Sequence, residues 1–318
     1  MKLLSLLICG CLCSQTLMAD NWNVYVAKYK QDKACAISYT FDDGLAEQYS
    51  MAAPQLEKHG FKGTFAICGG VINGENGRRD STRMTWAQVK DLSDRGHEIS
   101  NHGYRHRNFA RFPLDTIRMD IHLNDSAILA HTGKPVVTFV YPNNNKKKEP
   151  RKIAEQNRVG TRTVQRAIGG RSKADELNQW VTRLIETRDW GVGMTHGITY
   201  GYDHFKQPQI LWDHLDDVKS RESMIWVGTL AEVAAYTRER DEVKLDVIQK
   251  KGKITVTPSL SLDPNLFHEP LTLVIEGQGI KKVTAKQNGK RLAVRLTDKG
   301  AVCDFNPYGG TISIRIKN

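Results

Sequence analysis

The stretch Ile37-Ser38-Tyr39-Thr40-Phe41-Asp42-Asp43-Gly44 decides the fold of this chain. Its apolar, β-branched and aromatic residues predict a buried strand over residues 34–41. The strand ends in two adjacent carboxylates and a glycine. Because neighbouring side chains of an extended chain point to opposite sides, Asp42 and Asp43 can take different tasks, one holding a metal ion and one moving a proton. Whether they do so depends on histidines with metal-ligand spacing elsewhere in the chain.

Strand-like and helix-like segments alternate from this stretch to about residue 240. The alternation predicts an α/β domain with parallel strands over residues 20–240, close to the size of a single barrel. Further strands are predicted at 62–67, 97–101, 136–141, 159–164, 180–185, 190–195 and 224–227. Helices are predicted at 47–59, 85–95, 114–132, 150–157, 207–221 and 229–240.

The pattern changes after Arg240. Short, partly alternating runs follow one another, and turn residues such as Asn288-Gly289 separate them, which is a strong hairpin signal. Residues 241–318 are therefore predicted to form a small all-β, sandwich-like domain of undefined role. Its aromatic residues Phe267, Phe305 and Tyr308 are assigned to its core and not to a sugar-binding platform. The predicted strands are 243–248, 253–258, 271–276, 282–287, 291–296, 301–305 and 311–316.

The N-terminus has the pattern of a secretory signal over residues 1–19. Lys2 precedes an uncharged apolar run too short to span a bilayer, and Ala19 is a suitable last residue before cleavage. The alternative is a lipoprotein signal with a lipid anchor at Cys11, which the shortness of the run disfavours. Either pattern predicts export to the periplasm, the cell surface or the medium. No later stretch is apolar enough for a membrane span.

Composition excludes some classes of protein. The 318 residues are 40% hydrophobic and 25% charged, which is typical of a globular protein, and the net charge is +11. Lys and Arg are spread along the chain without alternating aromatic residues, so nucleic-acid binding is not expected. Outside the signal only Cys35, Cys68 and Cys303 remain. They are interpreted as buried small hydrophobes, with a Cys35–Cys68 disulfide left open.

Three histidines follow predicted strands. His102 and His106, four residues apart, come after the strand 97–101, and four-residue spacing on a helical turn lets two imidazoles bind one metal ion. The alternative, a surface basic cluster with Arg105 and Arg107, is equally open for the pair taken alone. His196 follows the strand 190–195. In a parallel barrel the carboxyl ends of the strands meet on one face, so these histidines are expected to lie beside Asp42 and Asp43.

The combination Thr40-Phe41-Asp42-Asp43-Gly44, His102-x-x-x-His106 and Thr195-His196-Gly197 resembles the polysaccharide deacetylase family, also called the NodB-homology domain or carbohydrate esterase family 4. The resemblance covers residues 34–240. It implies a distorted (β/α) barrel, usually of seven strands, and a divalent metal, commonly zinc, with cobalt and nickel as alternatives. It implies Asp43, His102 and His106 as metal ligands, Asp42 as general base and His196 as general acid.

Some positions depart from the family pattern. The third motif usually reads Arg-x-Pro followed by an aromatic residue, whereas this chain has Val140-Tyr141-Pro142-Asn143. The missing arginine normally orients the base. Arg162 or Arg166 could replace it, but the alternative that both are ordinary solvated charges is equally open. Gly103 stands where Ser or Thr is usual. The Asp and Trp of the fourth motif have no clear match, because Asp189-Trp190 lies too close to His196.

The resemblance also implies hydrolysis of N- or O-linked acetyl groups on a glycan. The backbone around Tyr141 and Pro142 is expected to contact the substrate and to donate a hydrogen bond to the oxyanion. The alternative is a non-catalytic glycan-binding pseudoenzyme with an adhesion-like sandwich. The altered third motif favours that alternative, whereas Asp42 and His196 oppose it, since binding alone requires neither.

Overall fold

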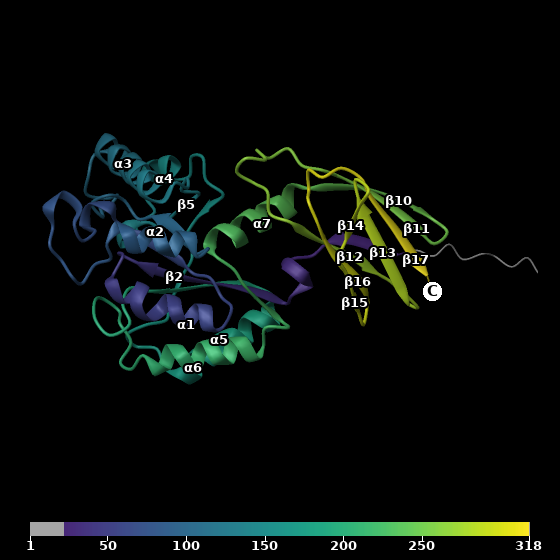
Figure 1. Cartoon of the computed structure of the whole chain (residues 1–318), viewed down its shortest axis with the longest axis horizontal. Coiled ribbons are helices and arrows are strands. Elements are labelled where there is room, and N and C mark those ends of the chain that lie inside the picture. Colours follow the sequence, from purple (N-terminus) through teal and green to yellow (C-terminus); the bar gives the residue numbers. More distant parts are fainter. Residues whose placement is uncertain (1–21, 318) are drawn as a thin grey trace, which may run out of the picture.

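The computed structural model describes residues 22–317, so the predicted signal over 1–19, with Cys11, lies outside the described residues. The chain forms an α/β domain and an all-β sandwich that lie side by side, with helix α7 (Leu230–Glu242) between them (Figure 1). Both predicted architectures are confirmed. No helix within 22–317 combines the length and the apolar character that crossing a bilayer requires.

The α/β domain is built on a curled parallel sheet with the buried strand β2 (Cys35–Asp42) near its middle. The continuous path runs β6-β5-β4-β3-β2-β8-β7, and β9 pairs with the first residues of β2 as an eighth strand. All eight residues of β2 are buried. The other strands are β3 (Thr64–Ile67), β4 (Glu98–Asn101), β5 (Thr138–Phe139), β6 (Gly160–Thr161), β7 (Arg166–Ala167), β8 (Trp190–Thr195) and β9 (Ile225–Val227).

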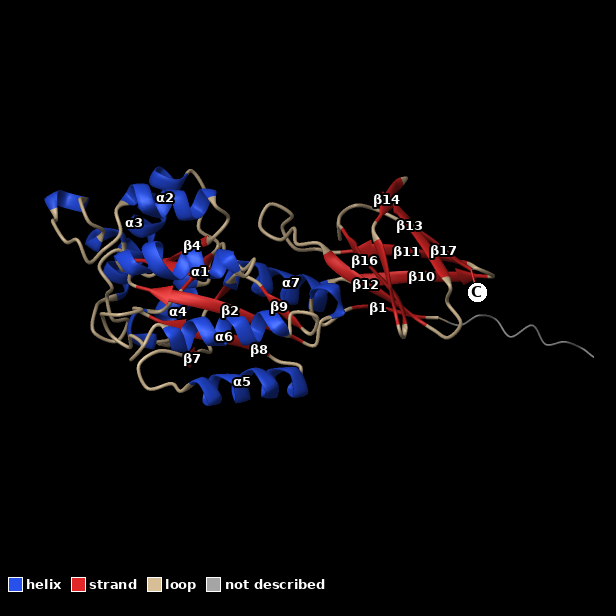
Figure 2. Ribbon diagram, turned by 60° about the horizontal axis from the view of Figure 1, so that its bottom comes forward, coloured by secondary structure: helices blue, strands red, loops and turns tan. Residues whose placement is uncertain are grey.

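Helices cover the outside of this sheet (Figure 2). Thr85 caps α2 and Thr229 caps α7, each in a capping box with the residue three positions later. Gly133, in the left-handed conformation, caps α3, which ends at Thr132, the predicted last residue. Besides α7 and four three-residue 3-10 helices, the described helices are η2 (Gln48–Ala52, a π-helix), α1 (Ala53–Lys58), α2 (Trp86–Asp94), α3 (Leu114–Thr132), α4 (Lys148–Ala154), α5 (Ala174–Thr187) and α6 (Gln209–Ser220).

The predicted strand 180–185 is wrong, because these residues lie inside helix α5. The run Trp180 to Ile185 is rich in residues that favour strands. The buried positions of α5, Leu177, Trp180, Val181 and Leu184, however, recur at helical spacing and form one face of the helix. Asp175 and Glu176 in the first turn also suit a helix N-terminus. The short strand β7, which the sequence had not indicated, takes the place next to β8.

The sandwich consists of two antiparallel sheets, with the orders β1-β12-β16-β15 and β10-β11-β17-β13-β14. Strand β1 (Asn23–Val26) comes from the start of the described chain and pairs with β12 (Leu271–Glu276). The predicted strand 291–296 divides at Ala293 into β14 (Lys290–Leu292) and β15 (Val294–Thr297), which belong to different sheets. The remaining strands are β10 (Lys244–Lys250), β11 (Lys253–Ser259), β13 (Lys282–Gln287), β16 (Gly300–Phe305) and β17 (Ile312–Lys317).

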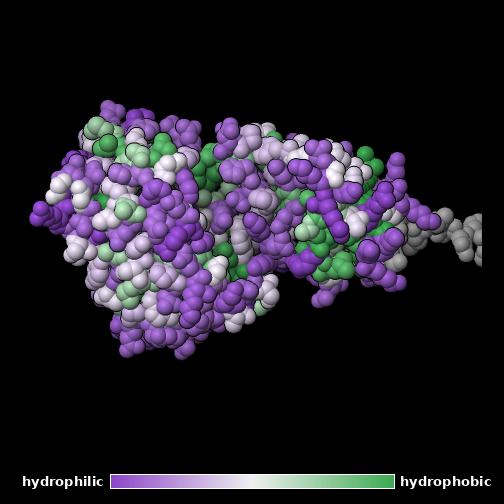
Figure 3. All heavy atoms as spheres, in the orientation of Figure 1, coloured by the Kyte–Doolittle hydropathy of each residue, from purple (hydrophilic) through white to green (hydrophobic). Residues whose placement is uncertain are grey.

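One apolar cluster joins the two domains. Trp226 and Tyr236 of the α/β domain belong to the same buried cluster as Leu273 and Phe305 of the sandwich. The Tyr236 hydroxyl donates a hydrogen bond to the carbonyl of Ala27, at 3.0 Å. Phe267 and Phe305 are buried, as expected of core residues. Hydrophilic side chains are spread over the visible surface of both domains (Figure 3).

The three described cysteines are free and buried, so the Cys35–Cys68 disulfide left open by the sequence is not formed. Burial raises the pKa of the Cys35 thiol to about 11 and that of Cys303 to about 12. Both thiols therefore act as small core side chains, in line with the preferred interpretation.

Candidate active site

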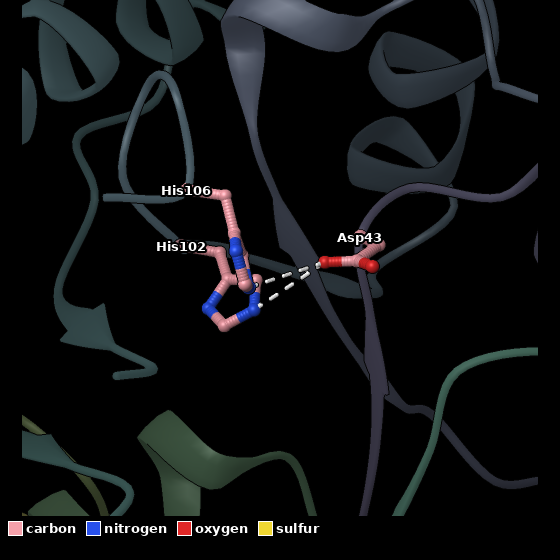
Figure 4. A group of neighbouring side chains, drawn as sticks. All are labelled: Asp43, His102 and His106. Atoms are coloured by element: carbon pink, nitrogen blue, oxygen red, sulfur yellow. Dashed lines mark ion pairs between the residues drawn. The ribbon is translucent and has the colours of Figure 1, made fainter. Parts of the chain in front are cut away.

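Asp43, His102 and His106 converge at the carboxyl end of the parallel sheet (Figure 4). The Nε2 atoms of His102 and His106 lie 3.5 and 3.7 Å from the same Asp43 oxygen, Oδ1. One candidate ligand atom from each residue lies within 4.8 Å of the others. Tetrahedral zinc with bonds of about 2.1 Å separates its ligand atoms by roughly 3.4 Å, so the donor set fits such an ion.

Unusual backbone conformations aim these side chains. Asp43 follows the last residue of β2 with φ 76°, and Gly44 continues with φ 68°, so the chain turns sharply as soon as the strand ends. The loop after β4 is not helical. Instead Gly103, at φ 72°, and His106, at φ 50°, bring both imidazoles to one side. Asp and His adopt positive φ more readily than bulky residues, and glycine does so without strain.

Hydrogen bonding leaves His102 in a form that could bind a metal ion. Its ring Nδ1 lies 2.8 Å from the carbonyl oxygen of Val140. A carbonyl can only accept, so Nδ1 carries the proton and Nε2 is left with its lone pair facing Asp43. Burial lowers the pKa of His102 to about 4, although Asp42 and Asp43 act in the opposite direction. The neutral imidazole is the form that binds metals.

Asp42 lies beside Asp43, His102 and His106, the group called the triad below, and forms a buried pair with Arg162. The guanidinium donates from Nη1 to Oδ1 at 2.7 Å and from Nη2 to Oδ2 at 2.5 Å, and Nη1 also reaches the Thr40 hydroxyl at 2.8 Å. Burial alone would raise the pKa of Asp42. The charge and hydrogen bonds of Arg162, helped by His102 and His196, outweigh burial and hold that pKa at about 2. Asp42 is therefore an ionised, oriented acceptor.

The arginine question that the sequence left open is thus answered by geometry. Arg162 follows β6 and reaches Asp42 from there, whereas Arg166 lies over the ring of Trp180, with its guanidinium carbon 5.7 Å from the ring centroid. Val140, at the usual arginine position, is buried and contributes its carbonyl to His102. Arg162 thus contacts the carboxylate of Asp42 from the end of β6, the strand next to β5, whereas Val140 follows β5 itself.

His196 follows β8 and lines the same cavity as Asp42 and the triad, with a volume of about 490 Å³. Its ring packs edge-on against Tyr202, with centroids 5.1 Å apart, and Tyr202 is 79% exposed at the cavity mouth. Tyr141 also lines the cavity, and its hydroxyl donates to Thr161 at 2.9 Å. Pro142 is not a lining residue, and its ring faces Gly103.

Two buried residues that the sequence analysis missed tie the strand ends together. Gln48 donates from Nε2 to the carbonyls of both Asp42 and His196, each at 2.6 Å. The adjacent Glu47 accepts from the backbone N–H groups of Ile198 and Thr199, in the loop that follows His196. Nothing in their spacing distinguishes Glu47 and Gln48 from ordinary polar residues at a helix start, since their partners lie far along the chain.

Asp120 of α3 braces the loop that carries the two histidines. One carboxylate oxygen accepts from the backbone N–H of Arg105 at 3.0 Å and lies 3.4 Å from Nε of Arg107. A side chain at Gly103 would place its Cβ 2.7 Å from the other oxygen of Asp120. Asp120 lies on the buried face of α3 beside Ile117 and Ile121, and a carboxylate at a core-facing position is a signal that sequence reasoning could have used.

Comparison with known proteins gives a family match over part of the chain. The family model described as polysaccharide deacetylase matches residues 29–162. This segment contains Asp42, Asp43, both triad histidines and Arg162, and it ends before His196.

Two curated relatives and one solved structure are similar to this chain. A gellan lyase of Bacillus sp. is 23% identical over 349 aligned residues, covering 89% of this chain and 13% of the lyase. The peptidoglycan-N-acetylmuramic acid deacetylase PdaA of Bacillus subtilis is 25% identical over 173 residues, covering 54% of this chain and 55% of PdaA. The chain thus spans about an eighth and about half of these relatives. A Mycobacterium smegmatis structure, provisionally described as a polysaccharide deacetylase, has 14% identity and a TM-score of 0.53, covering 68% of this chain and 94% of that one. At that identity the likeness concerns the fold.

Proposed function

We propose that the protein is a metal-dependent hydrolase that removes N- or O-linked acetyl groups from a polysaccharide, a proposal that the match of residues 29–162 to the polysaccharide deacetylase family supports. The single observation that carries the proposal is the composition of one cavity. It joins a two-histidine, one-carboxylate donor set to an ionised Asp42 and to His196. Glycan binding alone requires none of these groups.

Asp43, His102 and His106 are the proposed metal ligands. When bound there, a divalent ion, zinc or alternatively cobalt or nickel, supplies an acidified water and polarises the acetyl carbonyl. The protein's contribution is orientation. Val140 fixes the tautomer of His102, and the left-handed turns at Asp43 and His106 direct the side chains to one point.

Asp42 is the proposed general base. Arg162 keeps it ionised and holds both carboxylate oxygens, so its remaining lone pairs can accept the proton of the attacking water. His196 is the proposed general acid that protonates the leaving amine or alkoxide. The backbone N–H of Tyr141, on the cavity wall, is the proposed donor to the oxyanion.

The proposal includes an exported protein with an acetylated glycan as substrate and two structural units, the α/β domain over 20–240 and the sandwich over 241–318, with strand β1 of residues 23–26 joining the sandwich. The family and the name of the Bacillus subtilis relative support a glycan substrate outside the cell. The N-terminal sequence pattern supports export.

The test is acetate release from chitooligosaccharide, peptidoglycan and acetylxylan by the full chain. Release is expected from at least one of them, lost on chelation and restored by zinc or cobalt. If metal-loaded protein releases acetate from none of these glycans, the proposal fails.

Asp42→Asn separates catalysis from glycan binding. The substitution keeps the shape of the side chain and removes the base, so acetate release should be lost while metal content and glycan binding are retained. A variant that binds the glycan as the unchanged protein does, with neither form releasing acetate, would instead identify a pseudoenzyme.

A further inference from the structure

The outer face of the five-stranded sheet in the sandwich is strongly basic. Along β11, β13 and β17 exposed and less exposed positions alternate, so every second side chain points outward and the others fill the core. Many outward positions carry Lys or Arg, and the single acidic residue in the five strands is Asp246 on β10. We define the basic face as Lys250, Lys253, Lys282, Lys286, Arg291, Arg315 and Lys317.

The strand register places these charges directly opposite one another. Lys253 pairs with Lys250 on one side and with Arg315 on the other. Lys282 is opposite Lys317, and Lys286 is opposite Arg291. Like charges in directly opposite positions destabilise a sheet. Within residues 22–317 none of the seven forms an ion pair that would offset this repulsion. This repulsion lowers the stability of the sheet, so the positive charges do not serve folding. They suit the binding of a polyanionic partner.

The chemistry between the charges favours a glycan. Hydroxyl side chains alternate with the cations on the same face, with Thr255 opposite Ser313 and Thr284 opposite Arg315. Such hydroxyls can hydrogen-bond sugar hydroxyl groups. None of the five strands contains an aromatic residue on which nucleic-acid bases could stack. Ile248 is the one large apolar side chain of these strands that is mainly exposed, too little for insertion into a membrane.

We propose that the basic face binds a polyanionic, carboxylate-bearing polysaccharide and so holds the catalytic domain at an acidic glycan matrix. The choice of a glycan over other polyanions rests on the proposed function. The inference that the partner is a polyanion rests on the charge pattern alone. Strand β2 points away from the sandwich, so the catalytic cavity and the basic face lie at different ends of the molecule (Figure 2). The basic face is therefore a separate anchoring site that raises the effective concentration of the catalytic domain at its substrate.

The test measures binding of the full chain to polygalacturonate at low and high salt, with neutral dextran as the uncharged polymer. Binding to polygalacturonate is expected, with affinity falling as salt screens the charges, and dextran should not bind. The variant Lys253→Gln, Lys282→Gln, Arg315→Gln should lose about tenfold or more in affinity, because it removes three exposed charge contacts. The sheet should stay folded, because the changes also remove repulsion, and an unchanged or higher Tm checks this.

A matched control removes three exposed arginines from the α/β domain, with Arg79→Gln, Arg118→Gln and Arg183→Gln. It has the same net charge as the test variant and should bind polygalacturonate like the unchanged protein. Equal losses in both variants, or no loss in the test variant, would overturn the proposal. So would tighter binding of poly(dT) or of phosphatidylglycerol vesicles than of polygalacturonate by the same residues.

Activity on a short, soluble acetylated oligosaccharide separates this inference from the proposed function. The test variant should release acetate from it at the unchanged rate, because no substituted residue lies in the catalytic cavity. Binding without any acetate release would refute the proposed function alone. Acetate release without charge-dependent binding would refute the basic face alone.

Discussion

The side chain of Asp42 depends on a partner that lies far from it in sequence. A buried carboxylate would ordinarily resist ionisation, and Arg162, which is 120 positions later, reverses that tendency through two hydrogen bonds and its charge. Arg162 comes from the segment after β6 and not from the Val140 position. The contact with Asp42 therefore depends on the place of β6 in the sheet, which the order of the sequence motifs does not determine.

Arg162→Gln should abolish most activity and move the acidic limb of kcat/KM to higher pH. Without the guanidinium, burial raises the pKa of Asp42 from its value of about 2, so a larger fraction is protonated at mildly acidic pH. The measurement is a pH profile of acetate release at saturating metal. Arg166→Gln, which does not touch Asp42, is the control. An acidic limb that stays in place in Arg162→Gln would contradict the assignment.

Gln48→Leu should lower kcat about tenfold to a hundredfold with little change in KM or metal content. The amide of Gln48 is the link between the backbones of Asp42 and His196, and small misplacements of catalytic groups are costly. Steady-state kinetics and metal analysis of the purified variant check this.

Gln287→Leu is the matched control for Gln48→Leu. Gln287 is also buried and also bridges two backbone carbonyls, those of Asn306 and Gly310, but it lies in the sandwich. It should lose stability, by about 1–3 kcal/mol for unsatisfied buried groups, and keep its kcat. If both variants lose stability and neither loses kcat, Gln48 has no positioning role.

At the scale of elements, the loop between β4 and α3 is decisive, because it carries His106 and is held by Asp120. The spacing His102-x-x-x-His106 predicts that both imidazoles reach one ion, and the structure brings them together. The segment between the two histidines is not the helical turn that the spacing suggested. Two left-handed residues and the carboxylate of α3 produce the same result.

Gly103→Ala should weaken metal binding. Its Cβ would lie 2.7 Å from an Asp120 oxygen, and the residue would keep a positive φ, so the loop must move and His106 with it. Competition with a metal-sensitive dye measures the affinity. Gly133→Ala is the control, because Gly133 has a similar φ of 74° but no atom within 4 Å of the added Cβ. Both variants should lose about 1 kcal/mol of stability, and only Gly103→Ala should lose metal affinity.

At the scale of the whole molecule, α7 connects the domains and contains a buried carboxyl group. Glu239 accepts a hydrogen bond from the backbone N–H of Glu269 at 2.9 Å, and burial raises its pKa to about 7. The ionisable side chains near it are those of Glu269, which faces Lys30, and Tyr308. Packing of the sandwich on α7 thus produces a group that titrates near neutral pH.

Glu239→Gln should stabilise the protein at pH 8 but not at pH 5. The folded-state pKa of Glu239 lies above the unfolded value of about 4.3. Its contribution to the stability of the fold is therefore full below about pH 4.3, where the side chain is neutral in both states, and is lost as the pH rises through about 7. Thermal unfolding at the two pH values measures it, with a gain in Tm of roughly 2–4 °C expected at pH 8 alone. Glu242→Gln, exposed on the same helix, should show no such pH dependence. An equal change in Tm at both pH values would refute the explanation.

The sequence by itself determined the α/β class, the β-rich C-terminal part, and the identity of Asp42, Asp43, His102, His106 and His196 as site candidates. These features are local, because hydrophobic periodicity, turn residues and spacing are recorded in short segments, and parallel strands bring their carboxyl ends together. The one wrong element, the strand at 180–185, arose where a β-branched run lies on a helix whose apolar face is set by packing.

Only the tertiary structure decided which arginine orients Asp42, that Gln48 joins the backbones of Asp42 and His196, and that β1 completes the sandwich. Each of these contacts joins residues more than a hundred positions apart, except that between Gln48 and Asp42. Sequence patterns do not record such pairings, because many polar residues could serve equally well until the sheet order fixes which of them meet. The Asp42-Asp43 turn can be predicted from the sequence. The chemical properties of its carboxylates depend on residues that are distant in sequence and adjacent in the fold.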